Sequence, residues 1–184
     1  YLRNVAGMLV LGVLIYVLMR TAGHYYVEGV GYSTIQAILN GDMQWPALLL
    51  LLFAAKLFAT SLSLGSGASG GIFSPALFMG ATLGGAFGAA ITTLHPMDGV
   101  TAITGAIIGM AAMVGGGTGA AMTAVTMIFE MTRDYDLVMP SIIAVALAIG
   151  IRRLLSAENI YTIKLVGRGH FVPKAMHANM FLVR

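Results

Sequence analysis

The feature that most constrains the fold of this chain is the spacing of its charged residues. The 41 residues 57–97 and the 31 residues 99–129 contain no Asp, Glu, Lys or Arg. A helix crosses a bilayer core with about 20 predominantly apolar residues, so each run is long enough to do so. Because 58% of the residues are hydrophobic and only 9% are charged, the sequence predicts an all-α, polytopic membrane protein and argues against a soluble globular domain.

The apolar runs predict where the helices lie. We expect helices over residues 5–19, 47–64, 72–93, 100–114, 120–131 and 137–151, a short helix over 33–39, and a turn at 95–99. Several runs are too short to cross a membrane alone, which is typical of the broken and re-entrant helices of transporters and channels. Lys56 lies inside the second run, where it is either a snorkelling or paired lysine or a charge on a permeation path.

Two glycine-rich segments are predicted to break these helices. Residues 65–71 read GSGASGG and residues 115–119 read GGGTG, and apolar runs flank both segments. Non-helical backbone at membrane depth must be buried in protein or line a watery cavity, because lipid cannot satisfy its polar groups. Gly80, Gly84 and Gly88 recur at every fourth position, which predicts close approach of a second helix.

The helix start near residue 72 is a candidate anion site. A helix that begins inside the membrane presents unpaired amides and the positive end of its dipole to the cavity ahead of it. Gly70 and Gly71 precede this start and Pro75 lies in its first turn, so the backbone can approach a ligand and no extra amide is orphaned. A glycine hinge that only packs explains the same residues, and both interpretations stay open at this point.

Other chemistries find little support in the sequence. Gly65, Gly67 and Gly70 match the dinucleotide fingerprint GxGxxG, but a long Leu-rich run precedes them and no acidic residue follows at about 20 positions. The chain has no cysteine. Its histidines show no metal-ligand spacing; they are His24, His95, His170 and His177. We therefore expect no metal, no cofactor and no enzymatic activity.

Residues 71–75, Gly-Ile-Phe-Ser-Pro, resemble the GxFxP signature of the CLC family of chloride channels and proton-coupled chloride transporters. The likeness extends to residues 29–32 (GVGY), 64–88 and 127–132 (MIFEMT). It implies that residues 1–169 form the C-terminal half of a CLC-type membrane domain, the second of two inverted repeats. Residues 170–184 then begin the linker that leads to cytoplasmic CBS domains in many members. The chain departs from the family at residues 119–123, which read GAAMT where many members have APLT after the glycine.

The resemblance also implies an anion site and a function. The amides of Ile72 and Phe73 and the hydroxyl of Tyr161 would bind the anion, and the helix start would be formed by Gly70, Gly71, Ser74 and Pro75. The implied function is chloride transport by a voltage-gated-type channel or a chloride/proton antiporter, with chloride as the transported ion. These two stay open because the motif with the gating glutamate belongs to the first half of the family's domain. A transporter of nitrate or fluoride and a non-conducting membrane scaffold are the alternatives.

Charge and chain ends suggest the surroundings of the protein. The chain begins with Tyr1 rather than Met, so we expect it to be a piece of a longer protein. Six basic residues against Glu158 alone between positions 152 and 184 predict a cytoplasmic C-terminus. The expected partners are the N-terminal half of the same membrane domain, membrane lipid, possible CBS domains and a second copy in a homodimer, but no nucleic acid. The dimer contact is expected over residues 120–131 and 137–151, including Ile128 and Ile142.

Overall fold

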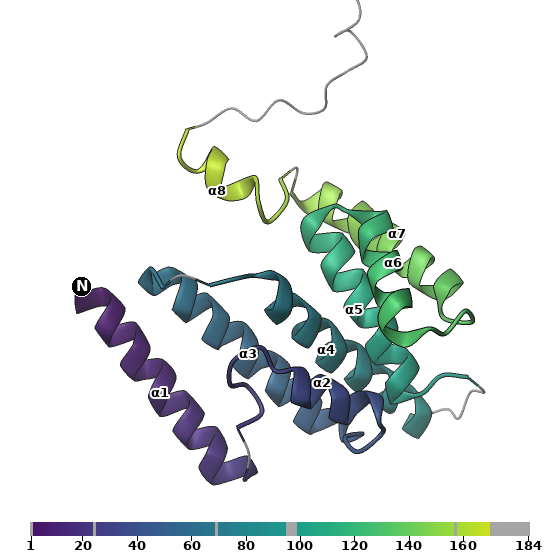
Figure 1. The fold of residues 1–184 in the computed structure, drawn as a ribbon, viewed down its shortest axis with the longest axis horizontal. Helices are drawn as coiled ribbons and strands as arrows, with labels where there is room; N and C mark the ends of the chain where they lie inside the picture. Colours follow the sequence, from purple (N-terminus) through teal and green to yellow (C-terminus); the bar gives the residue numbers. More distant parts are fainter. Residues whose placement is uncertain (1, 24, 69, 95–98, 157, 170–184) are drawn as a thin grey trace, which may run out of the picture.

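The structure is a computed structural model that describes residues 2–23, 25–68, 70–94, 99–156 and 158–169. Every regular element of this described part is an α-helix (Figure 1). The helices are α1 (Leu2–Ala22), α2 (Tyr32–Leu39), α3 (Pro46–Ser66), α4 (Phe73–Leu94), α5 (Ala102–Thr118), α6 (Ala121–Thr132), α7 (Val138–Leu155) and α8 (Ile163–Val166).

Four helices are long and apolar enough to cross a membrane. The spans are Asn4–Thr21 in α1, Pro46–Ser66, Phe73–Leu94 and Val138–Leu155, whereas α5 and α6 are shorter apolar helices. At about 1.5 Å per residue, the 22 residues of α4 reach across a hydrocarbon core, and the 12 residues of α6 do not. The prediction of an all-α, polytopic membrane protein is confirmed.

Helix α4 is the centre of the fold. It packs against α3 on one side and α5 on the other, and α5 in turn contacts α6 and α7. Figure 1 shows this order, with α1, α3 and α4 running side by side and α5 to α7 grouped beyond them. Phe78 and Leu77 of α4 are buried together with Ile38 of α2, Leu49 of α3 and Met110 of α5. The core therefore lies along α4 and fixes the position of its first turn.

The contact between α4 and α5 is made of glycines, as the four-residue spacing predicted. A Cβ atom at Gly84 would collide with the carbonyl oxygen of Gly105, and one at Gly109 would collide with that of Gly80. The missing side chains allow the two backbones to touch, which is how small residues stabilise helix pairs in membranes.

The first predicted break is shorter than expected. Helix α3 continues through Ser66 and ends at Gly67, which has a left-handed φ of 93°. The amide of Gly67 donates to the carbonyl of Leu64 at 3.3 Å and that of Ala68 to Ser63 at 3.1 Å, the paired bonds of a Schellman end. The described residues between α3 and α4 are therefore only 67, 68 and 70–72.

The second predicted break, over residues 115–119, is also shorter than expected, because only Gly119 and Ala120 separate α5 from α6. Helix α5 continues through Thr118 and ends at Gly119, where φ is 78°. Gly115 and Gly116 are helical, and α7 packs against them: a Cβ atom at Gly115 would lie 2.6 Å from Cγ1 of Val145, and one at Gly116 would lie 3.1 Å from Cβ of Ala148. These glycines provide room for a neighbouring helix and do not interrupt their own.

Two further expectations have mixed outcomes. The turn predicted at 95–99 lies mainly outside the described residues, which resume at Gly99. Ile128, expected on the dimer face, is buried with 2% exposure, whereas Ile142 is 44% exposed. Ile128 belongs to the hydrophobic core because it lies on the face of α6 that packs against α5 and α7.

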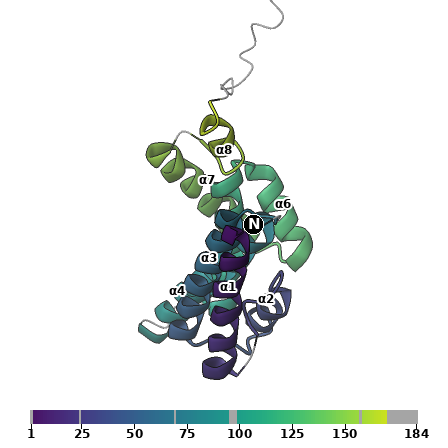
Figure 2. The same ribbon diagram turned by 90° about the vertical axis from the view of Figure 1, so that its left-hand side faces the viewer.

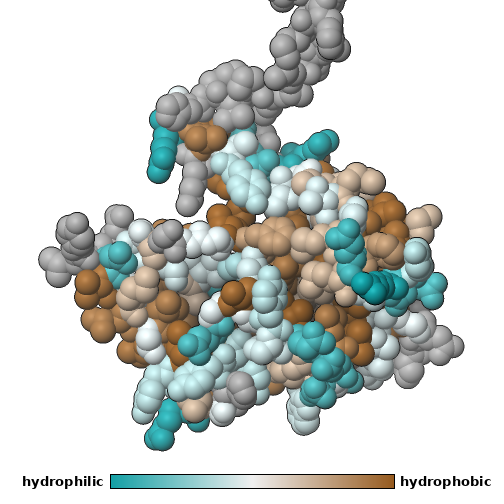
Figure 3. All heavy atoms as spheres, viewed as in Figure 1, coloured by the Kyte–Doolittle hydropathy of each residue, from teal (hydrophilic) through white to brown (hydrophobic). Residues whose placement is uncertain are grey.

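Apolar side chains cover much of the surface. Val5, Leu9 and Val13 of α1 and Ile143 and Leu147 of α7 are exposed. Figure 3 shows hydrophobic side chains at the surface on both sides of the molecule, and hydrophilic ones near α8 and along the lower edge. Such apolar surface requires lipid or protein around it.

Candidate anion site

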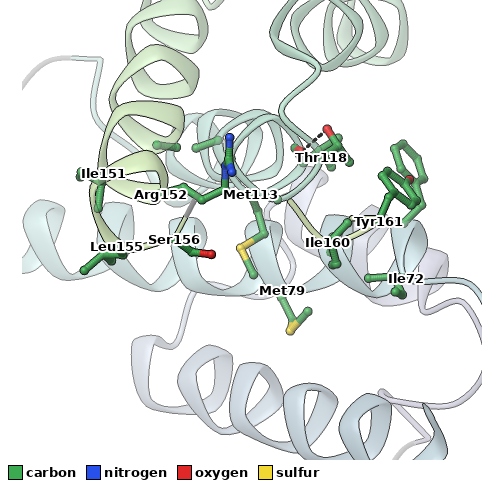
Figure 4. A pocket seen from close by; sticks show the side chains of 17 residues that line it. Ile72, Met79, Met113, Thr118, Ile151, Arg152, Leu155, Ser156, Ile160 and Tyr161 are labelled. Atoms are coloured by element: carbon green, nitrogen blue, oxygen red, sulfur yellow. Dashed lines mark hydrogen bonds between the residues drawn. The ribbon is translucent and has the colours of Figure 1, made fainter. Parts of the chain in front are cut away.

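A cavity of about 380 Å³ lies at the N-terminal end of α4. Its wall includes Ile72 and Phe73, the end of α5, the end of α7 and the segment that carries Tyr161. Figures 1 and 2 both place α8 at the end of the molecule where α4 begins, and Figure 4 shows Tyr161 next to Ile72, with Met79 and Met113 nearer the middle of the cavity. Three residues predicted as anion ligands therefore line one cavity, although up to 89 positions separate them in the sequence.

The first turn of α4 presents backbone donors at this cavity. The carbonyl of Ile72 accepts the first helical hydrogen bond, from the amide of Ala76 at 3.1 Å. The amides of Phe73 and Ser74, at the start of this turn, have no acceptor inside the helix. Together with the helix dipole, these amides give the cavity end of α4 a partial positive charge.

Tyr161 is held by the segment between α7 and α8. The amide of Ile160 donates to the carbonyl of Gly117 at 3.0 Å. The amide of Tyr161 donates to Oδ1 of Asn159 at 3.0 Å, and Asn159 and Thr162 exchange side-chain and backbone bonds of 2.9 Å each, in the manner of a capping box. Tyr161 is 57% exposed, so the described part of the chain leaves much of this residue uncovered.

The other residues predicted at the helix start face a second cavity. Gly70, Gly71, Ser74 and Pro75 line a space of about 440 Å³ that also borders Lys56. Oγ of Ser74 donates to the carbonyl of Val30 at 3.2 Å, which turns its side chain away from Tyr161. The start of α4 thus separates two cavities, and the predicted residues divide between them.

Lys56 is paired with backbone carbonyl groups, which agrees with the first of its two interpretations, a snorkelling or paired lysine. Its side chain is buried, and Nζ donates to the carbonyl oxygens of Val27 at 2.9 Å and Gly29 at 2.7 Å. Nζ also lies 5.0 Å from the ring centroid of Phe78. These contacts join α3 to the segment that precedes α2, and the same side chain borders the second cavity.

Arg152 is a cavity residue that the sequence did not single out. In the sequence it is one of the six basic residues that predict a cytoplasmic C-terminus, yet it lines the same cavity as Tyr161. Its Nη1 donates to the carbonyl of Glu158 at 3.0 Å, and its Nε is buried without a hydrogen-bond partner. An arginine in the last turn of an apolar helix, nine residues before the predicted ligand, is the signal that could have found it.

The structure also bears on the dinucleotide-like glycine motif and on possible metal ligands. The glycines of the apparent dinucleotide fingerprint lie at the end of α3 and in the segment after it, in a fold without strands among the described residues. The described residues bring together no group of three or more His, Asp or Glu side chains that could hold a metal ion. His24, His95, His170 and His177 lie outside the described residues, so the expected absence of a metal stays a prediction.

The helices and their apolar surface define a multi-pass integral membrane protein. The comparison with known proteins makes this class more specific. A family model for voltage gated chloride channels matches residues 1–153, and the chain belongs to this family. The resemblance to CLC proteins is thereby confirmed.

Named relatives support the same family. The chain is 39% identical over 118 residues to the putative chloride channel protein ClcB-like of Ralstonia nicotianae. This match covers 64% of this chain and 27% of the relative. It is 38% identical over 136 residues to the H(+)/Cl(-) exchange transporter ClcA of Vibrio cholerae, and this match covers 74% of this chain and 29% of the relative. It is 34% identical over 139 residues to the H(+)/Cl(-) exchange transporter ClcA of Yersinia pestis, and this match covers 76% of this chain and 29% of the relative. The chain matches less than a third of the length of these relatives.

Proposed function

We propose that this chain is the C-terminal half of the membrane domain of a chloride-transporting CLC protein, a channel or a chloride/proton exchanger. The family and the names of the relatives support transport of chloride, and the short matched share of each relative supports a missing partner half. The reaction is translocation, in which no covalent bond forms or breaks.

The observation that carries this proposal is the common cavity of Ile72, Phe73 and Tyr161. We propose that the amides at the start of α4 and the hydroxyl of Tyr161 bind the central anion. Partial charges from a helix end and a neutral hydroxyl attract an anion without trapping it, which a transport site requires. Gly70, Gly71, Ser74 and Pro75 would shape the helix start from the second cavity.

The surroundings proposed for the chain follow from its surface. A cytoplasmic C-terminus is supported by Arg152, Arg153 and Arg168 near the end of the described part. The exposed apolar faces of α6 and α7 support a homodimer contact, and that of α1 supports contact with lipid or with the N-terminal half. The proposed linker at 170–184 lies outside the described residues, and CBS domains beyond it stay a prediction.

Reconstitution in liposomes tests the proposal. We expect the full-length protein to release chloride from loaded vesicles. This chain alone should not, because half of the anion ligands are missing and polar backbone is exposed to lipid. Release of nitrate or fluoride but not chloride would support the other-anion alternative, and release of no anion by the full-length protein would support the scaffold. A proton flux driven by the chloride gradient would identify an exchanger.

A further inference from the structure

The guanidinium of Arg152 joins the end of α7 to the segment that carries Tyr161. Nη1 donates a 3.0 Å hydrogen bond to the carbonyl of Glu158, six residues further along the chain. Between them the chain leaves the helix at Ser156, which has an extended backbone. Figure 4 shows the side chain of Arg152 directed from α7 across the end of α5, on the cavity that Tyr161 also borders.

Local hydrogen bonds order the chain on both sides of the peptide bond from Glu158 to Asn159, between this contact and Tyr161. The amide of Glu158 donates to Oγ of Ser156 at 3.3 Å, and Oγ of Ser156 donates to the Glu158 carbonyl at 3.4 Å. The next residue, Asn159, accepts from the amide of Tyr161 at 3.0 Å. Because only two residues separate Glu158 from Tyr161, a shift of the Glu158 carbonyl moves the backbone that carries the tyrosine.

The environment of Arg152 argues against a purely stabilising role. Its Nε is buried and has no hydrogen-bond partner, and an unsatisfied buried donor costs free energy of folding. Its Nη2 lies beside Gly119, where a Cβ atom would be 3.7 Å away. The side chain is thus confined between α7 and the end of α5, and the hydrogen bond of its Nη1 is directed at the segment that carries Tyr161.

We propose that Arg152 is a positioning residue for the anion site, which sets the place of Tyr161 relative to the start of α4 through the carbonyl of Glu158. This inference rests on the proposed function, because it takes Tyr161 as a ligand of the anion. Arg153 provides a matched control, since it follows directly in the same last turn but is exposed and does not line the cavity.

Hydrogen exchange in the full-length protein tests the positioning without reference to chloride. In Arg152→Met, the amides of Ile160, Tyr161 and Thr162 should exchange at least about 10-fold faster than in the parent, because their segment loses its link to α7. Arg153→Met should leave these rates unchanged. Equal protection in Arg152→Met and the parent would overturn the inference.

Chloride binding measured by calorimetry tests the consequence. Arg152→Met should weaken chloride binding about 3- to 10-fold, and Arg153→Met should change it less than about twofold. In a Tyr161→Ala background, Arg152→Met should add almost nothing, because the residue that it positions is gone. Equal losses in both backgrounds would mean a general structural effect and would overturn the inference.

Failure of the proposed function has a different signature. If Tyr161→Ala leaves chloride affinity unchanged while Arg152→Met still accelerates exchange at residues 160–162, the tyrosine is not a ligand although Arg152 positions it. If Arg152→Met does not fold, Arg152→Lys replaces it in both experiments. The lysine keeps the charge but loses the planar fork. We therefore expect the same changes in exchange rate and chloride affinity, but smaller ones. Unchanged exchange and affinity would again overturn the inference.

Discussion

The carbonyl oxygen of Gly117 accepts a hydrogen bond of 3.0 Å from the amide of Ile160. This bond joins the last turn of α5 to the residue that precedes Tyr161. Because α5 continues through its glycine run to Thr118, residue 117 lies in the last turn of a helix, on the same cavity as the start of α4. The glycines that were predicted to break a helix therefore form part of the wall of the candidate anion site.

The two kinds of anion ligand should respond differently to substitution. Tyr161→Phe removes one neutral hydroxyl, worth about 0.5 to 1.5 kcal/mol, so chloride affinity should fall about 2- to 12-fold. Phe73→Leu keeps the backbone amide and should have a smaller effect. Calorimetric titration of the full-length protein measures both. An unchanged affinity in Tyr161→Phe together with loss of binding in Phe73→Leu would mean that Phe73 acts through its side chain and that the hydroxyl of Tyr161 is no ligand.

The glycine contact between α4 and α5 should tolerate no side chain. Gly84→Ala places a methyl group against the carbonyl of Gly105, and overpacking of this kind costs typically about 1 to 3 kcal/mol. Gly12→Ala in α1 is the control, because nothing lies within 4 Å of its Cβ position. Thermal unfolding in detergent should show a lower midpoint for Gly84→Ala and an equal or higher one for Gly12→Ala. Equal stability of both variants would contradict the close contact.

Lys56 should act on stability through the segment before α2. Lys56→Met leaves the carbonyls of Val27 and Gly29 without their donor, and an unsatisfied buried acceptor costs about 1 to 3 kcal/mol. Proteolysis within residues 25–31 should therefore become faster in this variant. Thr60→Val, which changes a polar side chain on the same cavity, should leave the cleavage rate unchanged. Unaltered proteolysis of Lys56→Met would contradict this role of the lysine in holding the segment before α2.

The proposed dimer should depend on the exposed face of α7. Ile142 is 44% exposed, and Ile142→Trp should shift the full-length protein from dimer to monomer with little change in chloride flux per subunit. Val13→Trp, on α1 and 62% exposed, serves as the control and should remain dimeric. Cross-linking in detergent distinguishes the two states. A dimer that persists in Ile142→Trp but dissociates in Val13→Trp would move the contact to α1.

The sequence by itself determined the features that depend on local chemistry. Runs without charge predicted the membrane helices, because each helix satisfies its own backbone bonds in lipid. Trp45 and Pro46 at the start of α3 and the motif at residues 71–75 gave correct helix starts to within a residue or two. The motif also indicated the family, through its resemblance to the GxFxP signature.

Tertiary structure alone decided how these elements use the same residue types. Glycine permits a helix, a left-handed end or a close contact: residues 115 and 116 lie in a helix packed against α7, whereas Gly67 ends α3. The burial of Ile128 and the approach of Tyr161 to Phe73 depend on which helices meet. The bond of Arg152 to Glu158, six residues further along the chain, likewise depends on the extended backbone at Ser156, where the chain leaves α7. The contacts of Ile128 and Tyr161 join residues that are distant in the sequence, and no local pattern specifies them.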